Sequence, residues 1–176
     1  MNKKKYDLVN YYTIALDPIH IGSGSERLGR VDLSIIRESG TNLPKIPATS
    51  LNGAARYGTA IINNKIECAG RGGSGGEKHC GEINPACPVC VPFGFSKTLG
   101  KSRSMKGLAH FFDAHILLYP VNTMVGTIWI TSPLALEGVG LNEKFSVPNN
   151  CFHTLGNIKT KDALNFGWLL LTKEEG

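Results

Sequence analysis

The stretch NLPKIPATSLNGAAR, Asn42–Arg56, decides the fold because it joins a turn to the first helix of the chain. Its two prolines predict the turn, and either Thr49 or Ser50 can cap a helix that begins at Leu51. Two glycines weaken this helix, yet its alanines and isoleucines still give it one apolar face. The fold class therefore depends on what surrounds the helix.

Extended segments flank the helix on both sides. They are rich in β-branched and aromatic residues and cover residues 9–21, 31–38, 108–121, 124–136 and 166–175. This order is close to a β-α-β-β-α-β plan, with the second helix expected within 157–165. We therefore expect an α+β, ferredoxin-like (RRM-like) fold in one domain over 1–176. An insertion should occupy 63–106, and an irregular segment should occupy 137–161.

Composition limits the class of protein. The chain has 176 residues, 41% of them hydrophobic, and 19 Lys+Arg against 14 Asp+Glu give a net charge of +5. This balance favours a polyanionic partner such as nucleic acid. The cationic N-terminus MNKKK has no apolar stretch of a signal peptide behind it, and no run reaches the roughly 18 apolar residues of a membrane span. We therefore expect a cytoplasmic protein with reduced cysteines.

Four of the five cysteines lie in a glycine-rich stretch, residues 63–95, that cannot bury a core by hydrophobic contacts alone. Cys87 and Cys90 form a C-x-x-C pair, whose spacing brings two thiolates to one tetrahedral ion. A set of four sulfur-rich ligands, Cys80, Cys87, Cys90 and either Cys68 or His79, predicts a structural Zn²⁺. Two interpretations remain beside it: incidental free thiols, or a redox-active pair. The proline at position 92 does not suit the helix that a redox pair begins.

Glycines and cations gather where phosphates could bind. Residues 21–30, IGSGSERLGR, offer backbone N–H groups beside Arg27 and Arg30. The loop lacks the spacing of a P-loop, which disfavours a nucleotide triphosphatase. Further candidate phosphate contacts lie around the helix start and in the basic run before residue 107: Lys45, Ser50, Asn52, Arg56 and Lys106. Each alone is typical of a solvated surface, but together they favour RNA binding.

Four blocks of the sequence resemble a known family. They are HIGSG…GRVDLSIIRE (20–38), NLPKIPATSLNGAAR (42–56), CPVCVPFG (87–94) and GLAHFFDAHILLYPV (107–121). The blocks resemble the RAMP superfamily, most closely the backbone subunit of type III CRISPR–Cas effector complexes of the Cmr or Csm kind. Asp32 fills the acid of the family's (I/V)D-x-x-(I/V)-x-(R/K)-(E/D) run, and Phe112-Asp113-Ala114 fills its FxDA strand. The resemblance covers roughly residues 10–135.

The resemblance implies a ferredoxin-like palm and a thumb, for which the irregular segment is the candidate. Such subunits stack along a guide RNA, and target RNA is cleaved at regular intervals with the help of a divalent metal. Asp32 is then the catalytic acid, with Mg²⁺ or another divalent cation as cofactor. The implied guide contacts are His20, Lys45, Ser50, Asn52 and Arg56. The implied partners are guide RNA, target RNA, further copies of the chain and other effector subunits.

Three other functions fit the same residues. The chain could be a scaffold that binds RNA without cleaving it, with Asp32 capping a turn. It could also be a guide-processing endoribonuclease that uses His20 as a general base without metal. The third is a zinc-stabilised protein–protein module. Dependence on Mg²⁺ separates the endoribonuclease from the leading hypothesis, and salt-dependent RNA affinity excludes the protein–protein module.

Overall fold

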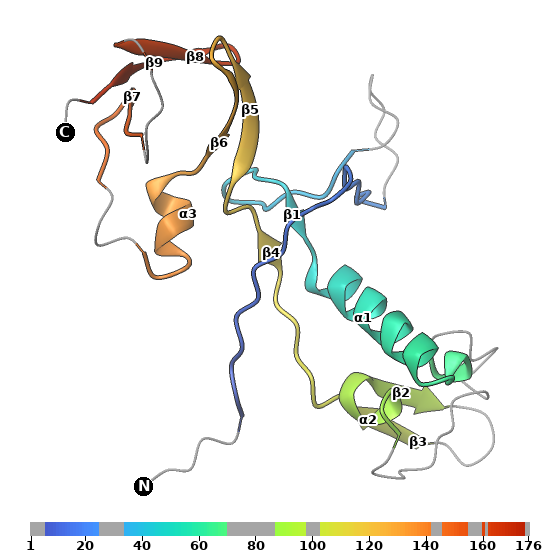
Figure 1. The fold of residues 1–176 in the computed structure, drawn as a ribbon. Coiled ribbons are helices and arrows are strands. Elements are labelled where there is room, and N and C mark those ends of the chain that lie inside the picture. Colours follow the sequence, from blue (N-terminus) through green and yellow to red (C-terminus); the bar gives the residue numbers. More distant parts are fainter. Residues whose placement is uncertain are drawn as a thin grey trace, which may run out of the picture.

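The computed structural model describes residues 6–24, 34–69, 87–97, 103–141, 146–154, 160 and 162–174 (Figure 1). These ranges form a mixed α+β structure with small sheets. The elements are β1 (Lys45–Ile46), α1 (Ala48–Ile62), the 3-10 turn η1 (Ile66–Cys68), α2 (Cys90–Phe93), β2 (Gly94–Lys97), β3 (Arg103–Lys106), β4 (Ala114–His115), β5 (Tyr119–Thr123), β6 (Gly126–Ile130), α3 (Pro133–Glu137), β7 (Cys151–Phe152), β8 (Ala163–Phe166) and β9 (Leu169–Lys173).

The strands pair in four separate sheets. Antiparallel pairs join β1 to β4, β2 to β3 and β5 to β6. The fourth sheet has the order β7-β9-β8, with β7 parallel to β9 and β8 antiparallel to it. The α+β class is therefore confirmed. A single four-stranded ferredoxin sheet is not formed by the described strands, so that finer arrangement stays a prediction.

Helix α1 begins three residues earlier than its local sequence indicates. It starts at Ala48 rather than Leu51, its N-cap residue is Pro47, and no side chain of that residue caps it. The cap comes from a distant part of the chain: the Ala48 amide donates to Asp113 Oδ1 at 2.8 Å. The other oxygen of Asp113 accepts from Lys45 Nζ at 2.5 Å. One carboxylate thus holds β1, β4 and the start of α1 together.

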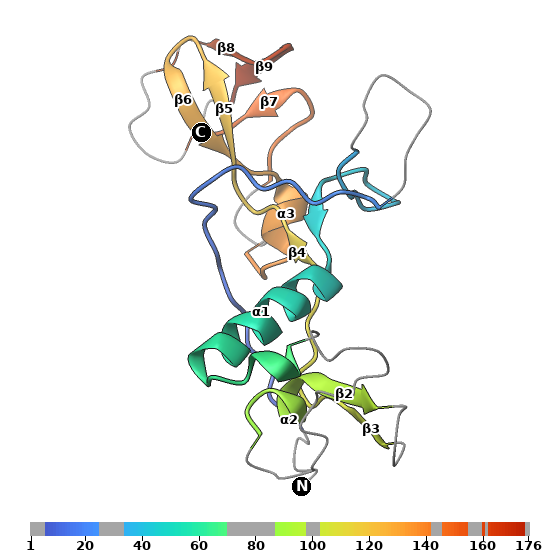
Figure 2. The same ribbon diagram turned by 90° about the vertical axis from the view of Figure 1, so that its right-hand side faces the viewer.

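The N-terminal segment, residues 6–20, is extended but belongs to no described sheet (Figures 1 and 2). Its apolar side chains are exposed, including Tyr11 at 84% and Leu16 at 90%. Among the described residues, the strand predicted over 9–21 is therefore unpaired over most of its length; it is paired at its end, where the Ile21 carbonyl accepts from the Ile36 amide at 2.9 Å. An extended chain forms a strand only where a neighbour accepts its backbone hydrogen bonds, and local composition does not supply that neighbour.

Four further segments differ from the sequence prediction. The single strand expected over 124–136 is β6 followed by α3, because Ser132 Oγ accepts from the third residue of a helix that has Pro133 in its first turn. The strand expected over 166–175 is split by a turn between β8 and β9. The helix expected within 157–165 is wrong where it is described, since residues 163–165 belong to β8. The segment predicted as irregular contains β7.

The largest buried cluster lies in the predicted insertion and not among the apolar strands. It contains Ala60 from α1 and, around it, Cys68, Cys87, Val89, Cys90 and Phe95. In both views α1 lies across α2 and the β2–β3 hairpin (Figure 2). The cluster therefore fastens α1 to the hairpin. In the β7-β9-β8 sheet Phe152 and Leu164 are also buried, and the Phe152 ring packs edge-on against Phe166 with the ring centres 5.2 Å apart.

Two glycines allow α2 and the hairpin to meet backbone to backbone. Gly94 has φ +75°, and a Cβ there would lie 2.6 Å from the Gly107 nitrogen. A Cβ on Gly107 would in turn lie 2.7 Å from the Phe93 carbonyl carbon. Such distances leave no room for a side chain. The glycines after C-P-V-C and before the FxDA strand are therefore requirements of this packing.

Candidate metal centre and nucleic-acid contacts

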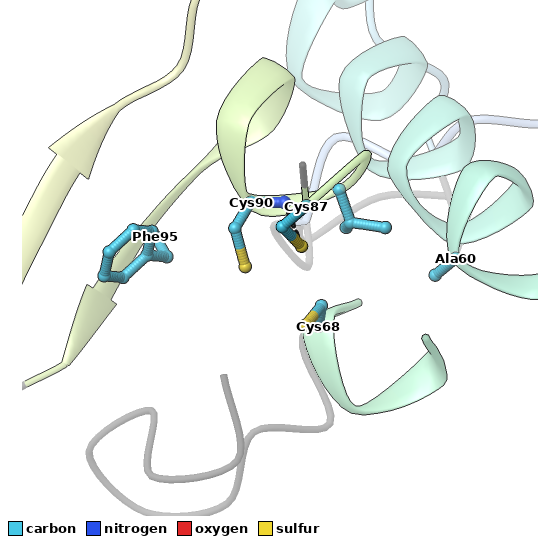
Figure 3. Packing of buried hydrophobic residues seen from close by; sticks show 6 residues of the cluster. Ala60, Cys68, Cys87, Cys90 and Phe95 are labelled. Carbon is cyan, nitrogen blue, oxygen red and sulfur yellow. Dashed lines mark hydrogen bonds between the residues drawn. The ribbon is translucent and has the colours of Figure 1, made fainter. Parts of the chain in front are cut away.

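Three cysteines converge in the buried cluster, and we name Cys68, Cys87 and Cys90 the thiol cluster. Their Sγ atoms all lie within 4.8 Å of one another, and each residue is buried. Figure 3 shows them approaching the same space from η1, from α2 and from the turn before α2. None of the three forms a disulfide. Thiols so arranged can serve as ligands of one soft metal ion.

The C-x-x-C turn explains how two of these thiols come together. Residues 88–89 form a turn, α2 starts at Cys90, and the Cys90 amide donates to Cys87 Sγ at 3.3 Å. A proline in α2 contradicts our expectation that Pro92 does not suit a helix. The ring is accommodated because it stands in the first turn, where its missing N–H has no intrahelical partner to lose.

Cys68 reaches the cluster from the far end of α1, through η1. The sequence left either Cys68 or His79 as a ligand, and the structure brings Cys68 to the pair. Arg56 fixes this turn: its Nε donates to the Cys68 carbonyl at 2.9 Å. The Nη2 atom of Arg56 is buried and has no hydrogen-bond partner among the described residues. His79 and Cys80 lie outside the described residues.

The predicted RNA contacts that the structure describes lie on separate elements. His20 is exposed on the N-terminal segment, Ser50 in the first turn of α1 and Lys106 at the end of β3. Asn52 is half-buried, and its Oδ1 atom lacks a hydrogen-bond partner within the described ranges. Arg27, Arg30 and Asp32 fall outside the described residues.

Lys45 is engaged within the chain. Its hydrogen bond to Asp113 raises the pKa of Lys45 above the ordinary lysine value. The same hydrogen bond, followed by the one from the Ala48 amide, lowers the pKa of Asp113. Asp113 thus occupies the anion site that a helix N-terminus with a nearby lysine provides. An RNA contact by Lys45 stays a prediction.

The sequence pattern did not indicate the structural contacts that Asp113 and Arg56 make. Asp113 lies 65 residues from the helix that it caps, so no capping pattern near α1 could indicate it. The FxDA block contains the acid but does not say what it contacts. Arg56 was interpreted by its charge alone, because its carbonyl partner belongs to a turn that the sequence pattern did not predict.

Comparison with known proteins agrees with the sequence blocks. The sequence profile of the RAMP superfamily matches residues 14–171. The match includes all four blocks quoted above, the thiol cluster and all of the β7-β9-β8 sheet except the last two residues of β9. No curated protein matches the chain. Within the described part of the chain, no helix has both the length and the apolar character needed to cross a membrane.

Proposed function

Because the chain belongs to the RAMP superfamily, we propose that it is a guide-RNA-binding backbone subunit of a type III CRISPR effector complex that cleaves target RNA. Membership itself implies a CRISPR-associated RNA-binding subunit that binds CRISPR RNA and other effector subunits. The match over 158 of 176 residues, counted from 14 to 171, carries the proposal. The type III assignment and the cleavage rest on the finer blocks around Asp32 and Asp113.

Charge supports the RNA-binding part. The net charge of +5 favours a phosphate backbone over a neutral partner. Ser50 and Lys106 are exposed and thus available to phosphates without a change in the fold. We propose these two residues, with His20 and Asn52, as guide contacts among the described residues. Arg27 and Arg30 join them as contacts from the glycine-rich loop, on the strength of its sequence.

Asp32 carries the proposed cleavage. It follows closely on a glycine-rich loop that has Arg27 and Arg30 and, as its one acid, Glu26. A carboxylate is a hard oxygen ligand of the kind that Mg²⁺ prefers. When bound, Mg²⁺ would supply charge stabilisation at the scissile phosphate. The part of Asp32 is to hold that ion near the RNA or to help activate the neighbouring 2′-hydroxyl for attack. The two arginines would balance phosphate charge.

Exposed apolar surface supports assembly with other subunits. Along the N-terminal segment, Tyr11 and Leu16 are almost fully exposed, and Trp168 at the β8–β9 turn is 94% exposed. Apolar exposure on this scale marks interaction surfaces. We propose that neighbouring subunits, including further copies of the chain, cover the N-terminal segment in the assembled complex.

The experiment for cleavage compares native chain and Asp32→Ala in the assembled complex, with target binding measured on the same samples. We expect Asp32→Ala to abolish cleavage while binding survives. Mg²⁺ should be withdrawn by dialysis and restored, because a strong chelator would also remove a metal from the thiol cluster. Glu137→Ala, which removes an exposed acid of α3, is the matched control and should cleave like the native complex.

Two results would contradict the catalytic part. If Asp32→Ala cleaves as fast as the native complex, Asp32 has no catalytic role. If neither complex cleaves while both bind target RNA, the chain is a non-catalytic scaffold. Cleavage of guide precursor without Mg²⁺ that is lost in His20→Ala would indicate the processing endoribonuclease instead.

A further inference from the structure

We propose that the thiol cluster binds one zinc ion, and that Arg56 is the positioning residue that holds Cys68 in place for it. The proposal rests on the convergence of three buried sulfurs, on the hydrogen bond at Cys87 Sγ and on the buried Nη2 atom of Arg56. The proposal does not depend on RNA binding. The metal site can therefore be wrong while the proposed function is right, and the proposed function can be wrong while the metal site is right.

The sulfur positions fit a tetrahedral ion. Zinc–thiolate bonds of about 2.3 Å place the sulfurs of a tetrahedral site about 3.8 Å apart. The Sγ atoms of the thiol cluster lie within 4.8 Å of one another, so small side-chain adjustments bring them to that spacing. A set of sulfur ligands at tetrahedral spacing selects zinc among the common divalent ions.

The hydrogen bond at Cys87 favours the metal-bound form. The Cys90 amide donates to Cys87 Sγ at 3.3 Å. Hydrogen bonds to a charged form stabilise that form, so an amide aimed at sulfur favours a thiolate over a thiol. Thiolates rather than thiols are metal ligands. The turn therefore prepares one ligand before the ion binds.

The charge of Arg56 supplies an independent argument. Its guanidinium donates to the Cys68 carbonyl, and its Nη2 atom is buried without a hydrogen-bond partner in the described structure. Among the described residues Arg56 forms no ion pair. The residue as a whole is half-buried, and a partly buried cation is stabilised by a counter-charge close to it. Zn²⁺ with three thiolates carries a net charge of −1, which provides a counter-charge next to the Cys68 turn.

Binding would join two parts of the chain that the sequence separates. Cys68 follows α1 and η1, whereas Cys87 and Cys90 start the unit of α2 and the β2–β3 hairpin. The ion would replace the protons of three thiols, which pass to the buffer, so the site would weaken as the pH falls. Cys80, which the sequence predicts as a ligand beside Cys87 and Cys90, falls outside the described residues, and the proposal does not depend on it.

The first test measures zinc by elemental analysis in the full-length chain purified without chelator. We expect one zinc per chain, and a loss of at least about tenfold in Cys68→Ser and Cys90→Ser. Cys151→Ser is the matched control. Cys151 forms no disulfide and lies outside the thiol cluster, and its Sγ atom is hydrogen-bonded with Thr172 Oγ1. This variant should keep its zinc.

Cobalt provides a readout on the native chain, which keeps the proposal testable even where a cysteine variant does not fold. After Co²⁺ replaces the native metal, we expect the sulfur-to-cobalt absorption and the visible bands of a tetrahedral thiolate site. Native chain without zinc, without these bands on Co²⁺ addition, or with a disulfide between two thiols of the cluster would overturn the metal site.

The role of Arg56 is tested by Arg56→Gln and Arg56→Lys. We expect Arg56→Gln to lower zinc affinity, measured by chelator competition, by about 10- to 100-fold, with partial recovery in Arg56→Lys. The salt dependence of RNA affinity should not change. Lys106→Gln is the reciprocal control. It should make the fall of log RNA affinity with log salt concentration less steep, by about 0.7 to 0.9 in slope, and it should leave zinc affinity unchanged. If Arg56→Gln behaves like Lys106→Gln, Arg56 is an RNA contact and not a positioning residue.

Discussion

Residues 6–20 and the region around the thiol cluster use their apolar side chains in opposite ways. The N-terminal segment is rich in tyrosine, leucine and isoleucine, yet its side chains lie in solvent. The cysteine-containing region is rich in glycine and poor in large apolar residues, yet it supplies most of the largest buried cluster. The difference teaches that burial in this chain follows from which segments meet, and hydropathy does not decide it.

The thiol cluster shows why the second region can bury residues at all. Cys68, Val89 and Cys90 are almost completely buried although few large side chains surround them. Small thiols allow the backbones of η1 and α2 to approach closely. In our proposal a metal ion adds the free energy that so few apolar contacts cannot provide. Among the described residues the N-terminal segment has no such internal partner, and in our proposal other subunits cover its surface.

The largest expected effect comes from removal of the metal, which should leave the region around the thiol cluster as poorly protected from amide hydrogen exchange as the N-terminal segment. We expect amide hydrogen exchange in 87–97 and 103–107 to accelerate by about 100-fold or more, because structural zinc contributes about 10 kcal/mol in small domains. The exchange rates of the amides in the β5–β6 hairpin should change little, and residues 6–20 should exchange fast with and without zinc. The measurement is exchange mass spectrometry with and without zinc. Unchanged protection in 87–97 would contradict the account.

A smaller effect is expected at the ion pair that fixes the start of α1. Asp113→Asn should lower the melting temperature, since it removes the charge that pairs with Lys45 and caps the Ala48 amide. The pKa of Asp113 is lowered in the folded chain, so its contribution to stability is complete above its ordinary value of 3.8 and is lost as the pH falls through the folded value. The pKa of Lys45 is raised, so its contribution is complete below the ordinary value of 10.5 and is lost as the pH rises through the folded value.

Melting curves between about pH 5 and pH 2 check this prediction. The native chain should lose more stability over that window than Asp113→Asn. Asp162→Asn, which changes an exposed acid without a described side-chain partner, is the control and should follow the native curve. Equal acid sensitivity in the native chain and in Asp113→Asn would show that the ion pair does not stabilise α1.

The smallest effect on stability is expected in the N-terminal segment. Leu16→Ser should change the free energy of unfolding by less than about 0.5 kcal/mol, because this side chain is 90% exposed. Leu164→Ala, at a buried leucine of β8, should cost about 2–5 kcal/mol in the same denaturant titration. Association between subunits, followed by light scattering, should weaken in Leu16→Ser. If Leu16→Ser lost as much free energy of unfolding as Leu164→Ala, the side chain of Leu16 would be buried in solution, and the contrast in burial between the two regions would be wrong.

Part of the fold could be predicted from sequence because its signals are local. The α+β class follows from a helix among β-branched and aromatic segments, and the family follows from blocks such as Asn42–Arg56. The start of α1 could not be predicted, because its cap is Asp113, a residue that only the folded chain brings near. Helix α3 carried a local signal in Ser132 and Pro133, but its apolar side chains resembled a strand.

In the candidate site, too, some residues could be predicted from local sequence and others could not. The C-x-x-C pair was recognisable because its spacing is a property of one turn. The choice of Cys68 needed the structure, since it depends on where η1 returns after α1. The charge of Arg56 indicated RNA, whereas its hydrogen bond to the Cys68 carbonyl indicates the metal centre. Sequence patterns name residue types well, but they do not say which backbone a side chain will meet.

The central claim, that the chain is an RNA-binding subunit, is tested most directly by the salt dependence of its affinity for a CRISPR guide RNA. The account predicts that log affinity falls linearly with log salt concentration, by about 0.7 in slope for each phosphate contact. The slope should become less steep in Lys106→Gln and stay unchanged in Arg56→Gln. No measurable affinity, or an affinity that is the same at about 50 and 200 mM salt, would contradict the claim.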